Sequence, residues 1–191
     1  MELNWENLEK AIRSCQGCGL YAGCRQKVPG QGNHRAALML IGEGPGEVED
    51  QQGLAFVGPA GQLLTQMLRA IGLEREQVFI CNIVKCRPPH NRQPLGEEAA
   101  ACKGFLRAQV ALVRPRVILL LGATAARNTL GDDLRITRDR GQWFERKGVW
   151  MMPTYHPSAL LRDPAKKREA WEDLKRLKNK LNELGLYQEG A

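Results

Sequence analysis

Short runs of apolar residues alternate along the chain with stretches in which apolar residues recur every three or four positions. The short runs are typical of strands buried on both faces of a sheet, and the longer stretches are typical of helices with one buried face. The predicted strands span residues 37–41, 78–84, 117–121 and 149–152, and the predicted helices span residues 5–12, 61–71, 97–113, 123–130 and 164–184. This alternation predicts an α/β fold with a mostly parallel four-stranded sheet between two layers of helices.

Length and composition are those of one compact globular unit. The chain has 191 residues, of which 43% are hydrophobic and 26% are charged. We therefore expect a single domain over residues 1–191, and a monomer. No apolar run approaches the roughly 20 residues that span a membrane, and the N-terminal MELNWENLEK lacks the apolar region of a signal peptide. We expect a cytoplasmic protein with no membrane partner.

An excess of positive charge indicates a polyanionic partner. The sequence holds 28 Lys and Arg against 21 Asp and Glu, which leaves a formal net charge of +7. Such a balance is compatible with nucleic acid without identifying it. Two basic segments stand out, namely Arg135, Arg138, Arg140, Arg146 and Lys147, and then Arg162, Lys166, Lys167 and Arg168. The second adjoins Leu160 and Leu161, and apolar residues beside cations are what a wedge into a duplex requires.

The segments after the predicted strands carry the candidate chemistry, because ligands of parallel α/β sheets bind beyond the carboxyl ends of the strands. The first strand runs into GEGPGEVEDQQG. Glu47 stands where a dinucleotide fingerprint needs its third glycine, and the carboxylates of this segment would repel a pyrophosphate. No Walker motif occurs either. An enzyme that acts on nucleotide phosphates is therefore disfavoured.

Three residues near these strand ends allow both a structural and a functional interpretation. Phe56 is either a core side chain or a stacking platform for a base. Asn82 lies in an apolar strand, where its amide either pairs with the backbone or presents a donor and an acceptor to a ligand. His156 follows the last strand, although a lone histidine is more often structural than functional.

The six cysteines need an explanation other than disulfides, which are rare in a reducing cytoplasm. Cys15 and Cys18 form a close C-x-x-C pair, and Cys86 and Cys102 flank a proline-rich loop. Four thiolates can bind either zinc or a 4Fe-4S cluster, and the absence of a second close pair favours the cluster. Cys24 is an alternative ligand.

Together these motifs resemble the family 4 uracil-DNA glycosylases, the iron-sulfur branch of the uracil-DNA glycosylase superfamily. The resemblance covers nearly the whole chain. It rests on GEGPGEVED, LAFVGPAGQLL, NIVKCRPPHNR and TYHPSALLR, and on the cysteines at 15, 18, 86 and 102. It implies a DNA repair enzyme that flips deoxyuridine out of single- or double-stranded DNA and hydrolyses its glycosidic bond, leaving an abasic site. It also implies a structural 4Fe-4S cluster held by Cys15, Cys18, Cys86 and Cys102.

The resemblance also implies a role for each pocket residue. Phe56 would stack on uracil, Asn82 would read its edge, and His156 would hydrogen-bond its O2 atom, where negative charge grows as the bond breaks. Glu43 would position the base or the attacking water. The implied pocket comprises Gly42, Gly44, Glu49, Phe56, Asn82, Asn91 and His156, the implied catalytic residues are Glu43, Asn82 and His156, and the implied DNA contacts are Ser158, Leu160, Leu161 and Arg162.

Several alternatives stay open. The best-known uracil glycosylases carry an aspartate where this chain has Gly44. Either Glu43, Glu49 or Asp50 takes over the water, or most of the rate comes from stabilising the leaving group and the sugar cation, with an undemanding water attack. A related branch forms a covalent adduct through a histidine, which makes His90 relevant, although GEGPG in place of GEQPG favours ordinary turnover. The rival from another class is a non-catalytic iron-sulfur or zinc module that binds nucleic acid. A sliding clamp is a candidate partner of the C-terminal tail.

Overall fold

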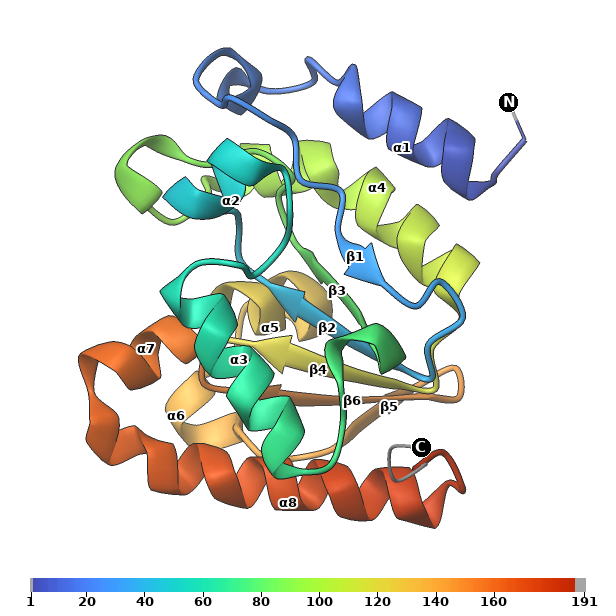
Figure 1. Ribbon diagram of the computed structural model, residues 1–191, viewed down its shortest axis with the longest axis vertical. Coiled ribbons are helices and arrows are strands. Elements are labelled where there is room, and N and C mark those ends of the chain that lie inside the picture. Colours follow the sequence, from blue (N-terminus) through green and yellow to red (C-terminus); the bar gives the residue numbers. More distant parts are fainter. Residues whose placement is uncertain (1, 188–191) are drawn as a thin grey trace.

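The computed structural model of this protein describes residues 2–187, and in this part of the chain six strands form one central sheet (Figure 1). From edge to edge, the strands are β1 (Gln31–Gly32), β3 (Phe79–Asn82), β2 (Leu38–Gly42), β4 (Val117–Leu121), β6 (Val149–Thr154) and β5 (Phe144–Arg146). The helices are α1 (Trp5–Arg13), α2 (Glu47–Gln52), α3 (Pro59–Ala70), α4 (Gly96–Val113), α5 (Ala123–Leu130), α6 (Ile136–Asp139), α7 (Pro157–Arg162) and α8 (Lys167–Glu183).

The α/β class is confirmed, but the prediction of a four-stranded sheet is wrong. The four predicted strands form the parallel centre of the sheet, in the order β3-β2-β4-β6. An antiparallel strand, β1 or β5, is added at each edge. These edge strands have 2 and 3 residues and are largely exposed, so they carry no apolar run that the sequence pattern could reveal.

Short helices also depart from the expected pattern. The segments after β2 and β6, predicted as loops, contain α2 and α7, which have 6 residues each and are too short to show a helical period. The helix predicted over 164–184 is divided into a 3-10 turn, Pro164–Lys166, and α8. Within residues 2–187, no helix combines the length and the apolar character needed to cross a membrane.

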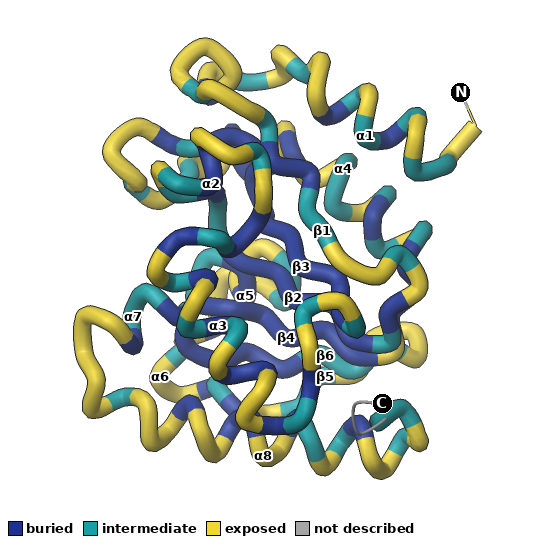
Figure 2. Tube along the Cα trace, viewed as in Figure 1, coloured by how far each residue is buried: buried dark blue, intermediate teal, exposed yellow. Residues whose placement is uncertain are grey.

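Alternate residues of the central strands pack into two separate cores, because successive side chains of a strand point to opposite faces. Leu38 and Leu40 of β2 join the core formed with α3 and α8. Met39 and Ile41 join the core formed with α4 and α5. In Figure 1, α8 lies below the sheet and α1 and α4 lie above it. Figure 2 shows β2, β3 and β4 buried along their length.

The strand order opens a crevice at the carboxyl ends of β2 and β4. The chain leaves β2 to form β3 on one side, and it leaves β4 to form β6 on the other side. The loops after these two strands therefore diverge, and such a switch point is where sheets of this kind bind ligands.

A buried carboxylate of α8 holds the end of β6. Asp173 is 0% exposed, accepts a hydrogen bond from the Thr154 hydroxyl at 2.7 Å and pairs with the Arg140 guanidinium at 2.7 Å. Arg140 also contacts Glu169, and Glu169 accepts a hydrogen bond from the Tyr155 hydroxyl at 2.7 Å. The turn that leads from β6 into α7 is therefore tied to α8 by a polar network.

We predict that Asp173→Ala lowers the free energy of unfolding by roughly 3 kcal/mol, because it leaves Arg140 and Thr154 without their buried partner. Urea denaturation followed by circular dichroism measures the change. Glu172→Ala is the matched control, since the Glu172–Lys175 ion pair on the same helix is exposed and contributes little. Equal losses for the two variants would contradict the importance of the buried network.

Candidate active site

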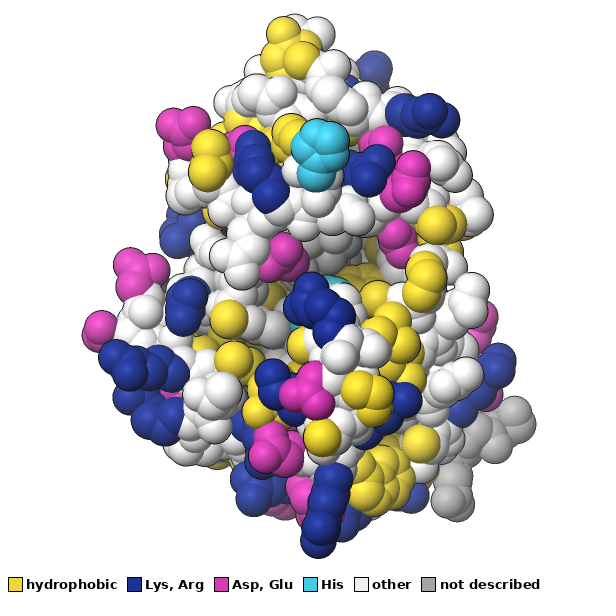
Figure 3. Space-filling view, turned by 90° about the vertical axis from the view of Figure 1, so that its left-hand side faces the viewer, with side chains coloured by type: hydrophobic (Ala, Val, Ile, Leu, Met, Phe, Trp, Pro, Cys, Tyr) yellow, Lys and Arg dark blue, Asp and Glu magenta, His cyan; other side chains and the backbone are white. Residues whose placement is uncertain are grey.

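A cavity of about 730 Å³ lies at the carboxyl ends of the central strands. Its lining comes from the loops after β2, β3 and β4 and from the turn between β6 and α7. Figure 3 shows this side of the molecule, which is hollowed between an upper and a lower part and carries Lys and Arg side chains around the hollow. The cavity thus lies at the switch point between β2 and β4, where the sheet topology predicts a ligand site.

The absence of a side chain at Gly42 brings two candidate residues together. Gly42 is paired with Asn82 across β2 and β3. A Cβ atom on Gly42 would lie 2.5 Å from Asn82 Oδ1 and 2.5 Å from Phe56 Cζ, closer than real Cβ contacts. Only glycine therefore lets the amide of Asn82 and the ring of Phe56 meet over the strand end.

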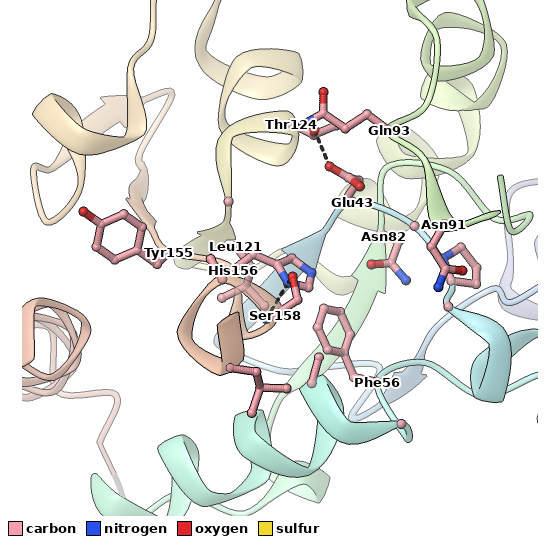
Figure 4. Close-up of a pocket in the computed structure, with 18 of the residues that line it drawn as sticks. Glu43, Phe56, Asn82, Asn91, Gln93, Leu121, Thr124, Tyr155, His156 and Ser158 are labelled. Atoms are coloured by element: carbon pink, nitrogen blue, oxygen red, sulfur yellow. Dashed lines mark hydrogen bonds between the residues drawn. The ribbon is translucent and has the colours of Figure 1, made fainter. Parts of the chain in front are cut away.

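The Asn82 carboxamide has an unpaired acceptor at the pocket. The residue is 1% exposed, and its Oδ1 atom has no hydrogen-bond partner within residues 2–187. A buried polar atom without a partner costs about 1–3 kcal/mol. A ligand that places an N–H group here would remove that cost. Figure 4 shows Asn82 and Phe56 projecting into the same space.

His156 presents a neutral ring whose proton lies on Nε2. Its Nδ1 atom accepts a hydrogen bond from the Ser158 N–H at 3.0 Å and lies 2.8 Å from the Ser158 hydroxyl. Although part of the residue is open to the pocket, burial, assisted by Arg162, lowers the pKa of His156 from 6.5 to about 4. Because Nδ1 is an acceptor, Nε2 is the donor. The ring centroid lies 5.5 Å from that of Phe56.

Glu43 is held by the first turn of α5. Its Oε2 atom accepts a hydrogen bond from the Thr124 hydroxyl, as the dashed line in Figure 4 shows. Both residues line the cavity. The contact fixes the direction of the carboxylate and leaves its second oxygen available for water or for a ligand.

The other two acidic candidates, Glu49 and Asp50, accept hydrogen bonds from backbone N–H groups. Glu49 lines the cavity, but its Oε1 atom accepts hydrogen bonds from the N–H groups of Val57 at 2.9 Å and Gly58 at 2.7 Å. Asp50 is 3% exposed, does not line the cavity and accepts a hydrogen bond from the Arg25 N–H at 2.8 Å. Of the three carboxylates, Glu43 and Glu49 line the cavity, and Glu43 is the one without a backbone N–H partner.

The loop that carries Phe56 is held from both sides. Phe56 has a φ angle of 52°, a left-handed conformation that side chains adopt at a cost. Glu49 holds the N–H groups after it, while Arg75 donates to the Phe56 carbonyl at 2.9 Å and to the preceding carbonyl at 2.8 Å. Arg75 was not predicted from the sequence, because it lies in a polar 3-10 turn outside every motif.

Two further predicted pocket residues, Gly44 and Asn91, also line the cavity. A Cβ atom on Gly44 would lie 2.8 Å from Val84 Cγ2, so the backbone packs closely there. Asn91 has a φ angle of 57° and accepts a hydrogen bond from Arg87 Nε at 2.7 Å. The neighbouring His90 is exposed and does not line the cavity.

The four residues predicted to contact DNA lie on α7, but they differ in how far they are exposed. Leu160 is 1% exposed and belongs to the core, whereas Leu161 is 45% exposed and lines the cavity with Arg162. The Ser158 hydroxyl faces His156, so its contact is internal. The surface of α7 therefore presents Leu161 and Arg162, and Leu160 lies beneath it.

The two basic segments differ in how their charges are used. In the first, Arg138 pairs with Asp139, Arg140 pairs with Asp173, and Arg146 donates to the carbonyl groups at the end of α5. Arg140 and Arg146 thus bind segments distant in the sequence, whereas Arg138 pairs with its chain neighbour. In the second segment, Arg162 and Lys166 line the cavity. The positive charge at the pocket thus comes from Arg162 at the end of α7, from Lys166 beyond it and from Arg92, whose guanidinium pairs with Glu98.

Five cysteines gather where the N-terminal segment meets α4. Cys18, Cys24, Cys86 and Cys102 all belong to the same core region, and burial and the nearby Cys18 and Cys15 raise the pKa of Cys102. Burial and the neighbouring Cys24 raise the pKa of Cys86. Within residues 2–187, however, no three side chains are arranged closely enough to hold a metal ion. The donor set fits a cluster chemically, since thiols from two segments converge in one apolar region.

Comparison with known proteins identifies the class to which the fold and the cavity belong. Residues 29–175 match the family model described as the uracil DNA glycosylase superfamily. The chain is 44% identical to a type-4 uracil-DNA glycosylase of Thermotoga maritima, over 94% of this chain and 96% of that protein. It is 41% identical to the type-4 enzyme of Sulfurisphaera tokodaii, over 91% of this chain and 83% of that protein. A type-5 uracil-DNA glycosylase of Pyrobaculum aerophilum is 32% identical over 70% of this chain.

The chain belongs to the uracil-DNA glycosylase superfamily, and its similarity is to the type-4 branch. The family resemblance stated from the sequence motifs is therefore confirmed.

We predict that His156 stays neutral, in the Nε2–H form, throughout the neutral pH range. With a folded-state pKa of about 4 against the ordinary 6.5, the stability that comes from the neutral ring is present above pH 6.5 and is lost as the pH falls toward 4. NMR spectra of the imidazole nitrogens recorded between pH 3.5 and 8, with the exposed His90 as internal control, measure this directly. A His156 titration midpoint near 6.5 would contradict the assignment.

Proposed function

We propose that this protein is a uracil-DNA glycosylase that hydrolyses the glycosidic bond of deoxyuridine in DNA, releasing uracil and leaving an abasic site. The unpaired Oδ1 atom of Asn82, beside Phe56 and the neutral His156, carries the proposal. Membership of the superfamily and identities of 41–44% to type-4 enzymes support the same function.

Uracil recognition follows from the hydrogen-bonding edge of the base. Uracil offers an N3–H donor and an O4 acceptor, which complement the oxygen and the NH₂ group of the Asn82 amide. Cytosine presents the reverse pattern. Its N3 acceptor would face the amide oxygen of Asn82, and its amino group would face the amide NH₂ group. Phe56, rigidly held, supplies the stacking surface for the flipped base.

Bond cleavage depends on stabilising the leaving uracil anion. The glycosidic bond breaks toward a cationic sugar and an anionic base, and Nε2–H of His156 would donate to O2 as negative charge grows there. A neutral donor suits this task, since it needs no proton transfer. Glu43, oriented by Thr124, would hold the attacking water through its free carboxylate oxygen.

DNA would bind along the hollow face. Arg162 and Lys166, at the rim of the cavity, would contact phosphates, and the exposed Leu161 would fill the space left by the flipped nucleotide. The burial of Leu160 assigns it a packing role in place of the DNA contact expected from the sequence.

The 4Fe-4S cluster is part of the proposal, with Cys15, Cys18, Cys86 and Cys102 as its ligands. When bound, a cluster supplies four strong iron–thiolate bonds that cross-link the N-terminal segment to α4, and hydrolysis needs no redox step. The contact between Cys24 and Cys86 keeps Cys24 as the competing ligand.

The remaining expectations stay predictions. They are a single domain over residues 1–191, a monomer, a cytoplasmic location and a sliding clamp as partner of the C-terminal tail. Residues 188–191 of that tail lie outside the described part of the chain. Ordinary turnover is preferred over a covalent adduct, because His90 is not among the residues that line the cavity.

An oligonucleotide assay tests the proposed function. Duplex and single-stranded oligonucleotides with one uracil are incubated with the protein and then treated with alkali, which cleaves the strand at an abasic site. We expect strand cleavage at the uracil and none in a matched cytosine oligonucleotide. Intact strands would refute the glycosylase activity and favour a non-catalytic module that binds nucleic acid. A protein–DNA adduct stable in SDS would indicate the branch that forms a covalent adduct.

We predict that Glu43→Gln lowers the single-turnover rate of uracil release by about 10²- to 10⁴-fold, because the amide cannot accept a proton from water. DNA affinity should stay nearly unchanged, which a fluorescence anisotropy titration checks. Glu6→Gln, at an exposed position of α1, is the matched control and should keep the wild-type rate. A near wild-type rate for Glu43→Gln would refute the assigned role.

The ligand set predicts a distinct pattern of iron loss. Anaerobically purified protein should contain about four iron atoms per chain and absorb near roughly 400 nm. Cys86→Ser should lose iron and absorbance, and Cys24→Ser should retain both. Iron loss from Cys24→Ser alone would show that Cys24 is the ligand, and zinc in place of iron would exclude the cluster.

A further inference from the structure

A fully buried lysine lies directly behind the residue proposed to read uracil. Lys85 is 1% exposed and does not line the cavity. Its ammonium group donates to the backbone oxygen of Asn82 at 2.7 Å and to Oε1 of Gln109 at 2.6 Å. Gln109, on α4 and 0% exposed, donates in turn to the Pro29 carbonyl at 2.6 Å.

This chain of hydrogen bonds joins three segments that are distant in the sequence. The segment after the N-terminal cysteines is reached through Pro29 and through the Val28 N–H, which donates to the Lys85 carbonyl at 2.8 Å. Helix α4 is reached through Gln109. The end of β3 is reached through Asn82. Lys85 is in contact with all three.

The position is costly for a cation. Taking an ammonium group out of water costs several kcal/mol unless a counter-charge compensates. Within residues 2–187, no carboxylate forms an ion pair with Lys85, and the two acceptors named above are neutral. The ionisable groups that favour its charged form are the thiols of Cys81 and Cys102. A methionine would fill nearly the same volume without this cost, so the hydrogen bonds themselves are what the lysine contributes.

The hydrogen bond from Lys85 to the Asn82 carbonyl fixes the backbone of the residue proposed to read the base. Asn82 is the last residue of β3, and the chain then turns away, with the Ile83 N–H bonded to the Gly42 carbonyl at 2.9 Å. The carbonyl carbon and Cβ of Asn82 are bonded to the same Cα atom, so a shift of the backbone at this residue carries the carboxamide with it. A misplacement of about 1 Å can cost a factor of 10² in rate.

We propose that Lys85 is a positioning residue for uracil recognition, which holds the Asn82 peptide so that the carboxamide meets the base edge. The proposal rests on the proposed function, since it assigns Lys85 a role in that reaction. Lys85 acts through Asn82 and touches neither the base nor the sugar.

A double-mutant cycle tests the proposal. Single-turnover rates of uracil release are measured for the wild type, Lys85→Met, Asn82→Ala and the double variant. Lys85→Met should lose about 10- to 50-fold, and the same change in the Asn82→Ala background should lose no more than about threefold, because residues that act as a unit are non-additive. A purely structural role would give equal losses in both backgrounds, and that result would overturn the proposal.

Controls separate the other causes of a lower rate. Lys10→Met, at an exposed position of α1, should keep the wild-type rate. Lys85→Met should retain the wild-type iron content, and loss of iron would overturn the proposal by assigning the effect to the cysteine region. If Lys85→Met does not fold, Gln109→Leu, which removes one anchor of the ammonium, should show the same non-additivity with a smaller loss. A wild-type protein that releases no uracil would instead refute the proposed function itself.

Discussion

The close approach of Phe56 and Asn82 over Gly42 is the constraint on which the pocket depends. It requires glycine at the end of β2, parallel pairing of β2 with β3 in this register, and an aromatic ring turned inward by a left-handed backbone. The ring position requires a second glycine, because a Cβ atom on Gly61 would lie 1.9 Å from the Phe56 carbonyl carbon. Glu49 and Arg75 then hold the backbone on either side. Several segments of the N-terminal half of the chain therefore fix the position of one side chain, the aromatic ring of Phe56.

The groups proposed to contact the base are neutral, whereas those proposed to contact the DNA phosphates are positively charged. Inside the cavity, the groups proposed to touch the base are neutral, since the pKa of His156 is lowered to about 4 and Asn82 carries no charge. In the proposed reaction, a neutral donor would strengthen its hydrogen bond as the leaving base gains charge. Arg162 and Lys166 also line the cavity, and they are the cations that we propose to contact DNA phosphates. The net charge of +7 is thus only partly available to DNA, because Arg138 and Arg140 are paired internally.

The sequence predicted the buried parallel strands well, because a strand covered on both faces must be apolar throughout, as Val117–Leu121 is. It missed β1 and β5, whose exposed residues are free of that requirement. Phe56, Asn82 and His156 were found through residue type and position after a strand, and the structure places them around one cavity. Arg75, Thr124 and Lys85 were not found, because their roles arise from hydrogen bonds to segments distant in the sequence. Leu160 and Leu161 could not be separated, since which of two adjacent leucines is buried depends on how α7 packs.

The central claim is that the Asn82 carboxamide selects uracil by its donor and acceptor pattern, and Asn82→Asp tests it most directly. An aspartate lacks the NH₂ donor that matches O4 of uracil, and it accepts from the exocyclic amino group of cytosine. Single-turnover rates on otherwise identical uracil and cytosine oligonucleotides give the ratio of the two activities. The account predicts that this ratio falls by at least about 100-fold in Asn82→Asp, because a site built to hydrogen-bond one edge discriminates strongly against the other. An unchanged ratio, with the loss shared equally by both bases, would contradict it.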